Sequence, residues 1–196
     1  MPLKNIKERK RELRAYYKKL RAECPQDIKQ DLDKELTQKF LLLDEYKNCD
    51  TLFAFVSMPI ECDTSKIIDN ALLDNKRVAL PKCKNKSGIM DFYFINSKDD
   101  LKKGMYSIFE PDSDKCKLVT DFSHGLCLVP GLCFDFQGYR LGFGKGYYDR
   151  FLNDFGGTSV GICYSRYVEK SLPHGIFDKY TDILVTEKFV NHNHND

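Results

Sequence analysis

The chain has 196 residues, of which 42% are hydrophobic and 31% are charged. This balance is typical of one globular domain that is large enough to bury a proper core. The formal net charge of +2 gives no strong field for nucleic acid, and no apolar run approaches the ~18 residues of a membrane span. We therefore expect no nucleic-acid partner and no membrane partner.

The eight cysteines are widely and irregularly spaced and form no C-x-x-C pair. Structural zinc sites usually contain such close pairs, so the spacing does not indicate zinc. The first residues are basic, but the apolar segment of a secretory signal does not follow them. The sequence therefore predicts free thiols in a cytoplasmic protein.

Apolar residues at helical spacing predict a helix over residues 5–22, which Pro25 ends, and a second helix over 28–43. Beyond them, short apolar runs rich in strand formers alternate with helical patterns, and Pro81 is expected to end one strand. In chain order we expect a strand at 51–58, a helix at 64–75, strands at 77–80, 90–95 and 125–129, a helix at 147–155, and strands at 159–164 and 183–185.

This alternation predicts an α/β fold with a largely parallel sheet that helices cover on both faces. Ligands of such sheets bind beyond the carboxyl ends of the strands. Three loops are expected there: one after Met58, one after Val129, and a glycine-rich loop before the helix at 147–155. We treat residues 1–190 as a single domain and expect the polar tail 191–196 to be disordered.

The glycine-rich loop lies in the segment 140–151, which reads RLGFGKGYYDRF. Gly142, Gly144 and Gly146 alternate around Lys145, so main-chain N–H groups, a lysine and a helix start together favour a nucleotide phosphate. The spacing fits neither a Walker A loop nor a Rossmann G-x-G-x-x-G loop. A glycine-rich turn without function is the alternative, although such a turn does not need the residues Lys-Gly-Tyr-Tyr-Asp.

The segments 128–135 and 140–150 closely resemble the 5-formyltetrahydrofolate cyclo-ligases, which are also called methenyltetrahydrofolate synthetases. Weaker matches at 10–14 (KRELR), 57–64 (SMPIECDT) and 181–185 (TDILV) follow the family's order and span nearly the whole chain. The resemblance implies a three-layer α/β fold, with a mostly parallel sheet between helices on both faces, that is Rossmann-like in part.

For ATP, the resemblance implies Lys10 and Arg14 on the first helix. By spacing alone, these two cations lie one turn apart and fit either a grip on polyphosphate or a solvated basic face. The resemblance adds the residues of the glycine-rich segment as ATP contacts: Arg140, Gly142, Phe143, Gly144, Lys145, Gly146, Tyr147 and Tyr148. Many relatives have arginine at the position of Phe143, which cannot donate to a phosphate and is expected to stack or pack.

For the folate, the resemblance implies contacts with Glu61, Val56, Met58, Tyr106 and Tyr148. Judged from the sequence pattern alone, Glu61 could equally be an ordinary exposed loop acid. For Val56 and Met58, the alternative to a folate contact is packing in the core.

Two acids are implied as ligands of Mg²⁺ by the resemblance, namely Asp149 and Asp182. Asp149 lies on the first turn of the predicted helix, where it could cap the helix or hold Mg²⁺ together with nucleotide phosphates. Asp182 begins the last predicted strand, which is a poor place for an acid without a partner.

The resemblance implies cyclisation of 5-formyltetrahydrofolate to 5,10-methenyltetrahydrofolate with release of ADP and phosphate, through a phosphorylated formyl group (an imino-phosphate). Lys145, Arg140 and Tyr148 are the expected catalytic residues, Mg²⁺ the cofactor, ATP the co-substrate, and the reduced folate the other small-molecule partner of a monomer.

Two other classes stay open. One is a different enzyme on a similar scaffold, such as a sugar-phosphate isomerase or another nucleotide-dependent ligase. The other is an RNA-binding protein that uses the basic N-terminal helix, against which the near-neutral charge and the lack of an aromatic platform speak.

Overall fold

The computed structural model describes residues 3–84, 88–104 and 108–193. The α-helices are α1 (Leu3–Ala22), α2 (Gln26–Leu41), α3 (Asp44–Asn48), α4 (Ser65–Leu73) and α5 (Tyr147–Asp154), with 3₁₀ turns at Lys98–Asp100 and Ser165–Tyr167. The strands are β1 (Thr51–Phe53), β2 (Arg77–Cys83), β3 (Met90–Ile95), β4 (Leu101–Lys103), β5 (Phe109–Pro111), β6 (Lys117–Leu118), β7 (Leu126–Val129), β8 (Cys133–Asp135), β9 (Arg140–Leu141), β10 (Thr158–Ile162), β11 (Val168–Glu169), β12 (Ile183–Val185) and β13 (Val190–His192).

The main sheet has eight strands in the order β13-β12-β10-β7-β1-β2-β3-β6. Its central strands, from β12 to β2, are parallel, whereas β13, β3 and β6 pair antiparallel at the two edges. A small sheet contains β11, β8 and β9. Of these strands, β8 and β9 connect β7 to the glycine-rich loop along the chain. The predicted α/β fold with a mostly parallel sheet is therefore confirmed.

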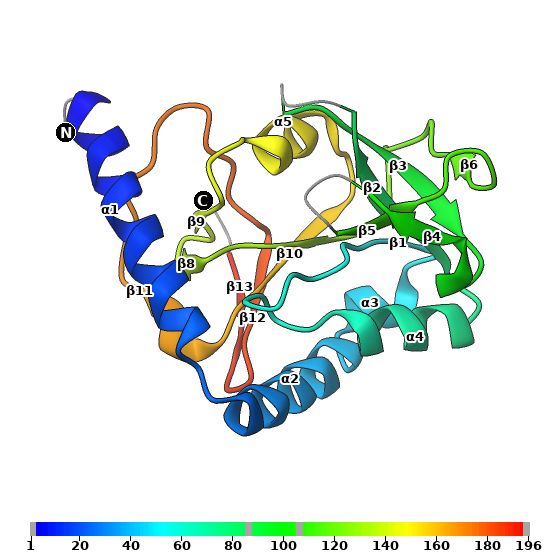
Figure 1. Ribbon diagram of the computed structural model, residues 1–196, viewed down its shortest axis with the longest axis horizontal. Coiled ribbons are helices and arrows are strands. Elements are labelled where there is room, and N and C mark those ends of the chain that lie inside the picture. The colour runs from blue at the N-terminus through cyan, green and yellow to red at the C-terminus, as the bar shows by residue number, and fades with distance from the viewer. Residues whose placement is uncertain (1–2, 85–87, 105–107, 194–196) are drawn as a thin grey trace.

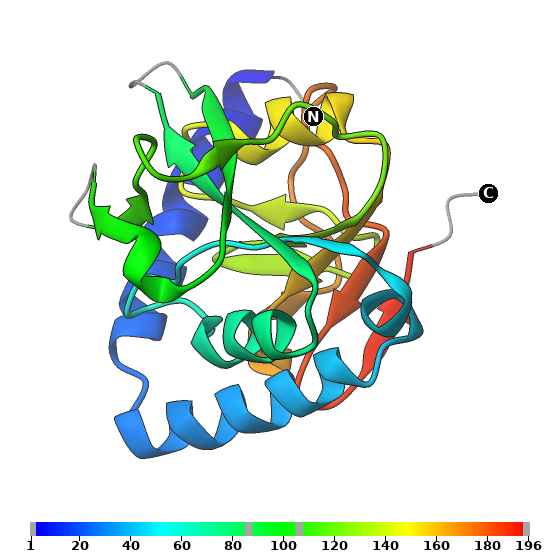
Figure 2. The same ribbon diagram turned by 90° about the vertical axis from the view of Figure 1, so that its right-hand side faces the viewer.

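Helices cover both faces of this sheet (Figures 1 and 2). On one face, α2, α3 and α4 pack on the larger core cluster, which includes Leu36, Phe40, Leu52 and Leu128. On the other face, α5 packs on a smaller aromatic cluster, in which the Phe53 and Phe92 rings lie 5.3 Å apart. The long helix α1 runs beside the sheet and reaches the loops beyond its strands (Figure 1).

Two predicted strand ends are wrong. The apolar run at 51–58 leaves the sheet after Phe53, because the Thr64 hydroxyl donates to Phe55 O (2.5 Å) and folds residues 54–64 into a buried loop. Pro81 does not end β2, which continues to Cys83. At Pro81 the strand has passed the end of β1 and pairs with β3 alone, so the missing N–H costs little.

The expected disorder of the polar tail 191–196 is also wrong for its first residues. Asn191 and His192 belong to β13, and the Asn193 amide donates to Asp182 O (2.7 Å). Main-chain pairing with β12 orders this segment although its side chains are polar, because a sheet edge needs backbone partners more than apolar side chains. Residues 194–196 lie outside the described residues.

Two composition-based expectations can also be compared with the structure. All eight cysteines are free, as the sequence predicted. Within the described ranges, no helix is both long and apolar enough to cross a bilayer.

The packing of α2 gives a test of the core. Phe40→Ala should lower the free energy of unfolding by roughly 3–5 kcal/mol, since the fully buried ring would leave a cavity between α2 and the sheet. Leu42→Ala, two residues away and 68% exposed, should stay within about 0.5 kcal/mol of wild type. Urea denaturation measures both variants, and equal effects would contradict this account of the core.

Candidate active site

The glycine-rich loop is shaped by backbone conformation and by an arginine from α1. Gly144 and Gly146 have φ angles of 97° and 70°, which lie in the left-handed region that favours glycine. Gly146 is also the N-cap of α5, so the loop ends at the positive end of a helix. Arg14 Nε donates to Gly142 O (2.9 Å), and a Cβ at Gly144 would lie 3.3 Å from the Arg14 guanidinium carbon.

Lys10 and Arg14 are both partly buried and have partners within the protein, so they do not belong to a solvated basic face. Lys10 Nζ lies 2.6 Å from each carboxylate oxygen of Asp178, which follows β11 in the chain. The two side chains of this ion pair are only 12% and 23% exposed. Asp178 also accepts from Gly175 N (2.6 Å), so its carboxylate stabilises the turn at residues 175–178 and binds Lys10 as well.

Arg140 lies deeper than the sequence suggested. Its side chain is 3% exposed, donates from Nη2 to Asp149 Oδ1 (2.8 Å) and from Nη1 to Lys179 O (2.7 Å). Asp149 Oδ1 also accepts from Lys179 N (3.2 Å). These contacts orient the Asp149 carboxylate from outside α5. Helix capping therefore does not explain the position of this acid, and Arg140 is its positioning partner.

A cleft of about 730 Å³ opens between α5 and the segment 176–179. Gly146 and Asp149 line it, and the exposed Lys145 precedes Gly146 at its rim. The cleft thus combines a helix N-terminus and a partly exposed carboxylate beside the two inward cations of α1. This is an arrangement that suits a nucleotide phosphate with a divalent cation.

Asp182 lies at the start of β12, bound to β10. Its Oδ2 accepts from Ser159 N (2.7 Å) and Ser159 Oγ (2.6 Å), which gives this acid the partner that its strand position demands. Burial raises the pKa of the Cys127 thiol, and the charges of Arg140 and Asp182 also act on it. The hydrogen bonds of the Asp182 side chain therefore tie it to Ser159 of β10. No group of three or more metal-binding side chains occurs in the described part of the chain.

Glu61 is a buried acid and not an exposed one. It is 5% exposed, and its Oε2 accepts from Met58 N (2.7 Å) within the loop 54–64. Burial raises the pKa of Glu61 to about 7, although the Met58 N–H and the charges of Arg21 and Lys29 lower it. Val56 is partly buried and packs against the larger core cluster.

Tyr148, on the first turn of α5, packs against the smaller aromatic cluster. Burial raises the pKa of the Tyr148 hydroxyl, and Cys127, Glu61 and Arg140 are among the groups whose charges also affect it. The hydroxyl is buried and has no hydrogen-bond partner among the described residues. A buried hydroxyl without a partner costs about 1–3 kcal/mol, which suggests that a ligand supplies the partner. Tyr106, the other predicted aromatic contact, lies outside the described residues.

Sequence reasoning missed Arg21, Asp33 and Asp178, which hold site loops in place. Arg21 is 4% exposed, yet it belongs to a basic helix that looked solvated. One signal was present: Arg21 is seven residues after Arg14 and four after the buried Tyr17, in phase with the inward stripe of α1. No local signal marked Asp33 or Asp178, whose partners lie far away in the chain.

Comparison with known proteins identifies the family. The model of the 5-formyltetrahydrofolate cyclo-ligase family matches residues 6–187. The chain belongs to this family. A probable cyclo-ligase of Schizosaccharomyces pombe is 32% identical over 164 residues, covering 76% of this chain and 80% of that protein. The cyclo-ligase of Mus musculus is 34% identical over 154 residues, covering 75% of each.

The family's fold is shared as well. The solved structure of 5,10-methenyltetrahydrofolate synthetase from Aquifex aeolicus superposes with a TM-score of 0.82 at 32% identity, covering 95% of this chain and 94% of that one. Membership in the cyclo-ligase family makes the chain an enzyme of folate metabolism. The glycine-rich segment and the inward face of α1 both lie within the part of the chain that the family matches.

The raised pKa of Glu61 makes stability depend on pH. The carboxyl has an ordinary pKa of 4.5, so the folded state binds more protons than the unfolded state up to pH of about 7 and loses stability as the pH rises through this window. Since one pKa unit is worth about 1.4 kcal/mol, the loss is about 3 kcal/mol. Glu61→Gln should remove it.

The free energy of unfolding of Glu61→Gln relative to wild type should therefore rise by that amount between about pH 4 and about pH 8, as measured by urea denaturation. Glu23→Gln, which changes an acid that is 59% exposed directly after α1, serves as the control. A difference that does not change with pH would contradict the raised pKa.

Proposed function

We propose that this enzyme catalyses the ATP- and Mg²⁺-dependent cyclisation of 5-formyltetrahydrofolate to 5,10-methenyltetrahydrofolate, with release of ADP and phosphate. The observation that supports this proposal most strongly is the meeting of three separate segments at one cleft. Gly146 and Asp149 line the cleft at the start of α5, and Lys145 directly precedes Gly146 in the chain. From α1, Lys10 binds Asp178 in the wall of the cleft, and Arg14 binds the glycine-rich loop. Family membership supports 5-formyltetrahydrofolate as the substrate of the enzyme.

The chemistry needs activation because the formyl oxygen on N5 is a poor leaving group. That oxygen attacks the γ-phosphorus of ATP, the bond to the β-phosphate oxygen breaks, and ADP leaves. N10 then attacks the formyl carbon, loses its proton, and expels the oxygen as phosphate from the imino-phosphate. The enzyme mainly positions the two substrates and neutralises charge on the moving phosphoryl group.

The phosphate-side roles follow from where each cation lies. Lys145 and the loop amides would contact the transferring phosphoryl group, because both lie at the exposed end of α5. Lys10 and Arg14 would bind the triphosphate from α1, with Asp178 giving up part of its hold on Lys10. Arg140 is buried against Asp149 and would act through that acid. Phe143 takes no charge role: its ring packs against the core, with Lys18 Nζ 5.5 Å from its centroid.

Asp149 fits a magnesium ligand on its own geometry. Both of its hydrogen bonds use Oδ1, which leaves Oδ2 without a partner among the described residues in a side chain that is 29% exposed to the cleft. Mg²⁺ commonly takes one or two carboxylates together with phosphate oxygens and water. Asp149 and Asp182 would hold the ion, which when bound neutralises phosphate charge.

The folate side would be formed by Glu61 and Tyr148. The Glu61 carboxylate can accept from the amino groups of the pterin, while the unpartnered Tyr148 hydroxyl can donate to the formyl group or to another polar atom of the folate. Met58 and Val56 would supply apolar contacts from the same loop.

The overall reaction is tested by mixing the protein with 5-formyltetrahydrofolate, ATP and Mg²⁺, and recording the near-ultraviolet absorption of the methenyl product. Product should appear, and omission of ATP or chelation of Mg²⁺ should abolish it, since the formyl oxygen cannot leave without activation. Turnover that persists without nucleotide in excess chelator would overturn phosphoryl transfer. ATP consumption that is independent of the folate would indicate a different enzyme.

Lys145→Ala should lower the turnover number roughly a hundredfold or more, as is typical for the loss of one group that stabilises transition-state charge. The Michaelis constant for ATP should change less, and Lys145→Arg should restore activity only in part, because a planar guanidinium fits a tight loop differently. Lys188→Ala, in the exposed turn between β12 and β13, is the matched control. Near-normal turnover of folded Lys145→Ala would leave catalysis to Mg²⁺ and the loop amides.

A further inference from the structure

The loop that carries Glu61 has no regular secondary structure, although it is largely buried. Residues 54–64 connect β1 to α4 without a helix or strand. Glu61 fixes its own position only relative to this loop, because its carboxylate accepts from Met58 N (2.7 Å) and its amide donates to Met58 O (2.9 Å). Other elements must therefore set where the carboxylate lies in the molecule.

Arg21 of α1 holds the loop on one side of Glu61. Its Nη1 donates to Ile60 O (3.0 Å), the residue directly before Glu61. Nε and Nη2 donate to Leu132 O (2.7 Å) and Gly131 O (3.0 Å), in the loop that follows β7. One buried guanidinium thus joins two loops at the carboxyl end of the sheet through main-chain carbonyls. Only a planar fork of donors can serve these acceptors together.

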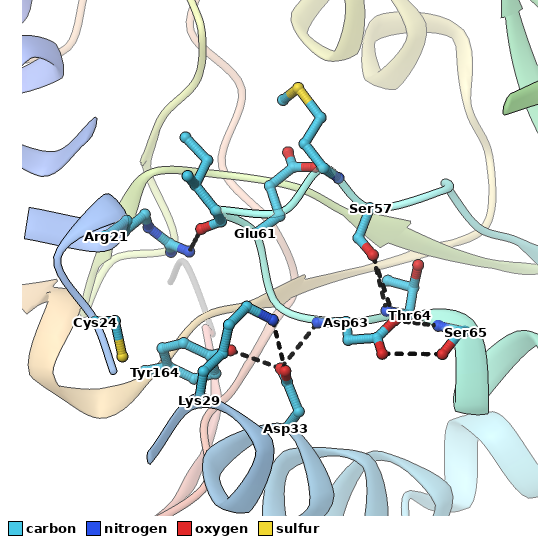
Figure 3. A network of polar contacts seen from close by, with 12 residues as sticks. Arg21, Cys24, Lys29, Asp33, Ser57, Glu61, Asp63, Thr64, Ser65 and Tyr164 are labelled. Atoms are coloured by element: carbon cyan, nitrogen blue, oxygen red, sulfur yellow. Dashed lines mark hydrogen bonds and ion pairs between the residues drawn. The ribbon is translucent and has the colours of Figure 1, made fainter. Parts of the chain in front are cut away.

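Asp33 of α2 holds the loop on the other side. Its Oδ1 accepts from Asp63 N (2.8 Å) and from the Tyr164 hydroxyl (2.6 Å), and its Oδ2 accepts from Lys29 Nζ (2.6 Å). The Tyr164 ring also lies 5.8 Å from the Arg21 guanidinium carbon, so it touches both anchors. Figure 3 shows Arg21 to the side of Glu61 and Asp33 below it, with the Glu61 side chain extending away from Asp33.

We infer that Arg21 and Asp33 are positioning residues for the Glu61 carboxylate, and that they determine how tightly the enzyme binds its folate substrate. The inference rests on the proposed function, in which Glu61 contacts the folate. Both anchors bond to the main chain within two residues of Glu61, and α1 and α2 supply them from outside the loop. Loss of either anchor lets the carboxylate shift, while the ATP cleft around α5 keeps its own contacts.

The charges near Glu61 determine which variants separate its placement from its electrostatic environment. Arg21 from α1 and Lys29 from α2 face the carboxylate, and Tyr148 of α5 is near it. Arg21→Lys keeps a positive charge but not the fork, so it separates placement from charge. Asp33→Asn keeps an acceptor for Asp63 N, whereas Asp33→Ala removes it. Asn at position 33 should therefore rescue most of what Ala loses.

The kinetic experiment compares Michaelis constants for the two substrates. Arg21→Lys and Asp33→Ala should each raise the constant for 5-formyltetrahydrofolate roughly tenfold or more, the size expected for losing a hydrogen bond to a charged group. The constant for ATP should change less than about twofold, within the scatter for independent sites. Arg9→Lys, on the exposed side of α1, is the matched control and should match wild type. Equal increases for both substrates would overturn the inference.

A double mutant tests whether Arg21 acts through Glu61. In a Glu61→Ala background, Arg21→Lys should raise the folate constant further by less than about twofold, since residues that act as a unit are not additive. If the increase in the double mutant equals the product of the increases in the two single mutants, Arg21 acts by another route and the inference is overturned.

Hydrogen exchange tests the anchors without any assay of activity. The amides of residues 57–63 should exchange roughly tenfold faster in Arg21→Lys and Asp33→Ala than in wild type, with the amides of α5 unchanged. Unchanged exchange at 57–63 would overturn the positioning role even if the enzyme is active. A different outcome is also informative: the anchor variants could show faster exchange at 57–63 while Glu61→Ala leaves the Michaelis constant for the folate unchanged. That result would overturn the assignment of Glu61 to the folate, and with it the link to substrate binding.

Discussion

Hydrogen bonds from the arginines of α1 to main-chain carbonyls hold the site together. Arg14 donates to the glycine-rich loop, and Arg21 donates to the loops that follow β1 and β7. Loops at the end of a parallel sheet have no ladder to fix them, because their backbone groups have left the strands. A rigid helix whose side chains end in five-donor forks can bond to several such loops together. The site is therefore a set of loops held largely by α1, with Asp33 of α2 as a further anchor of the loop 54–64.

This arrangement explains why cations lie on the inward face of a helix. Lys10, Arg14, Tyr17 and Arg21 follow one stripe of α1, where an ordinary amphipathic helix would present only apolar side chains. Carbonyl acceptors and the Asp178 carboxylate satisfy these charges, so burial does not leave them unpaired. Two of these cations, Lys10 and Arg14, contact Asp178 and the glycine-rich loop, next to the cleft in which we propose that the triphosphate binds.

The sequence was sufficient where local pattern decides structure and insufficient where distant partners decide it. Periodicity predicted the helices at 5–22 and 147–155 and the strands at 90–95 and 183–185 closely. The glycine spacing predicted a loop that ends on a helix N-terminus. Patterns of polarity could not show that Arg21 is buried, since its acceptors belong to residues 60, 131 and 132. They also could not show that Arg140 is buried in an ion pair with Asp149, or that main-chain pairing orders Asn191.

The long-range bonds of α1 have a consequence for how the protein is made. The acceptors of Arg21 at Gly131 and Leu132 lie 110 and 111 residues later in the chain, the acceptor of Arg14 lies 128 residues later, and the partner of Lys10 lies 168 residues later. Contacts of such large sequence separation form late, because loop closure must be completed before they stabilise anything. During synthesis α1 leaves the ribosome before the residues that bond to its polar stripe, and Asp178 follows Lys10 by 168 residues. The polar contacts of this helix are thus expected among the last to form, so that the loops which it joins reach their final positions late in folding.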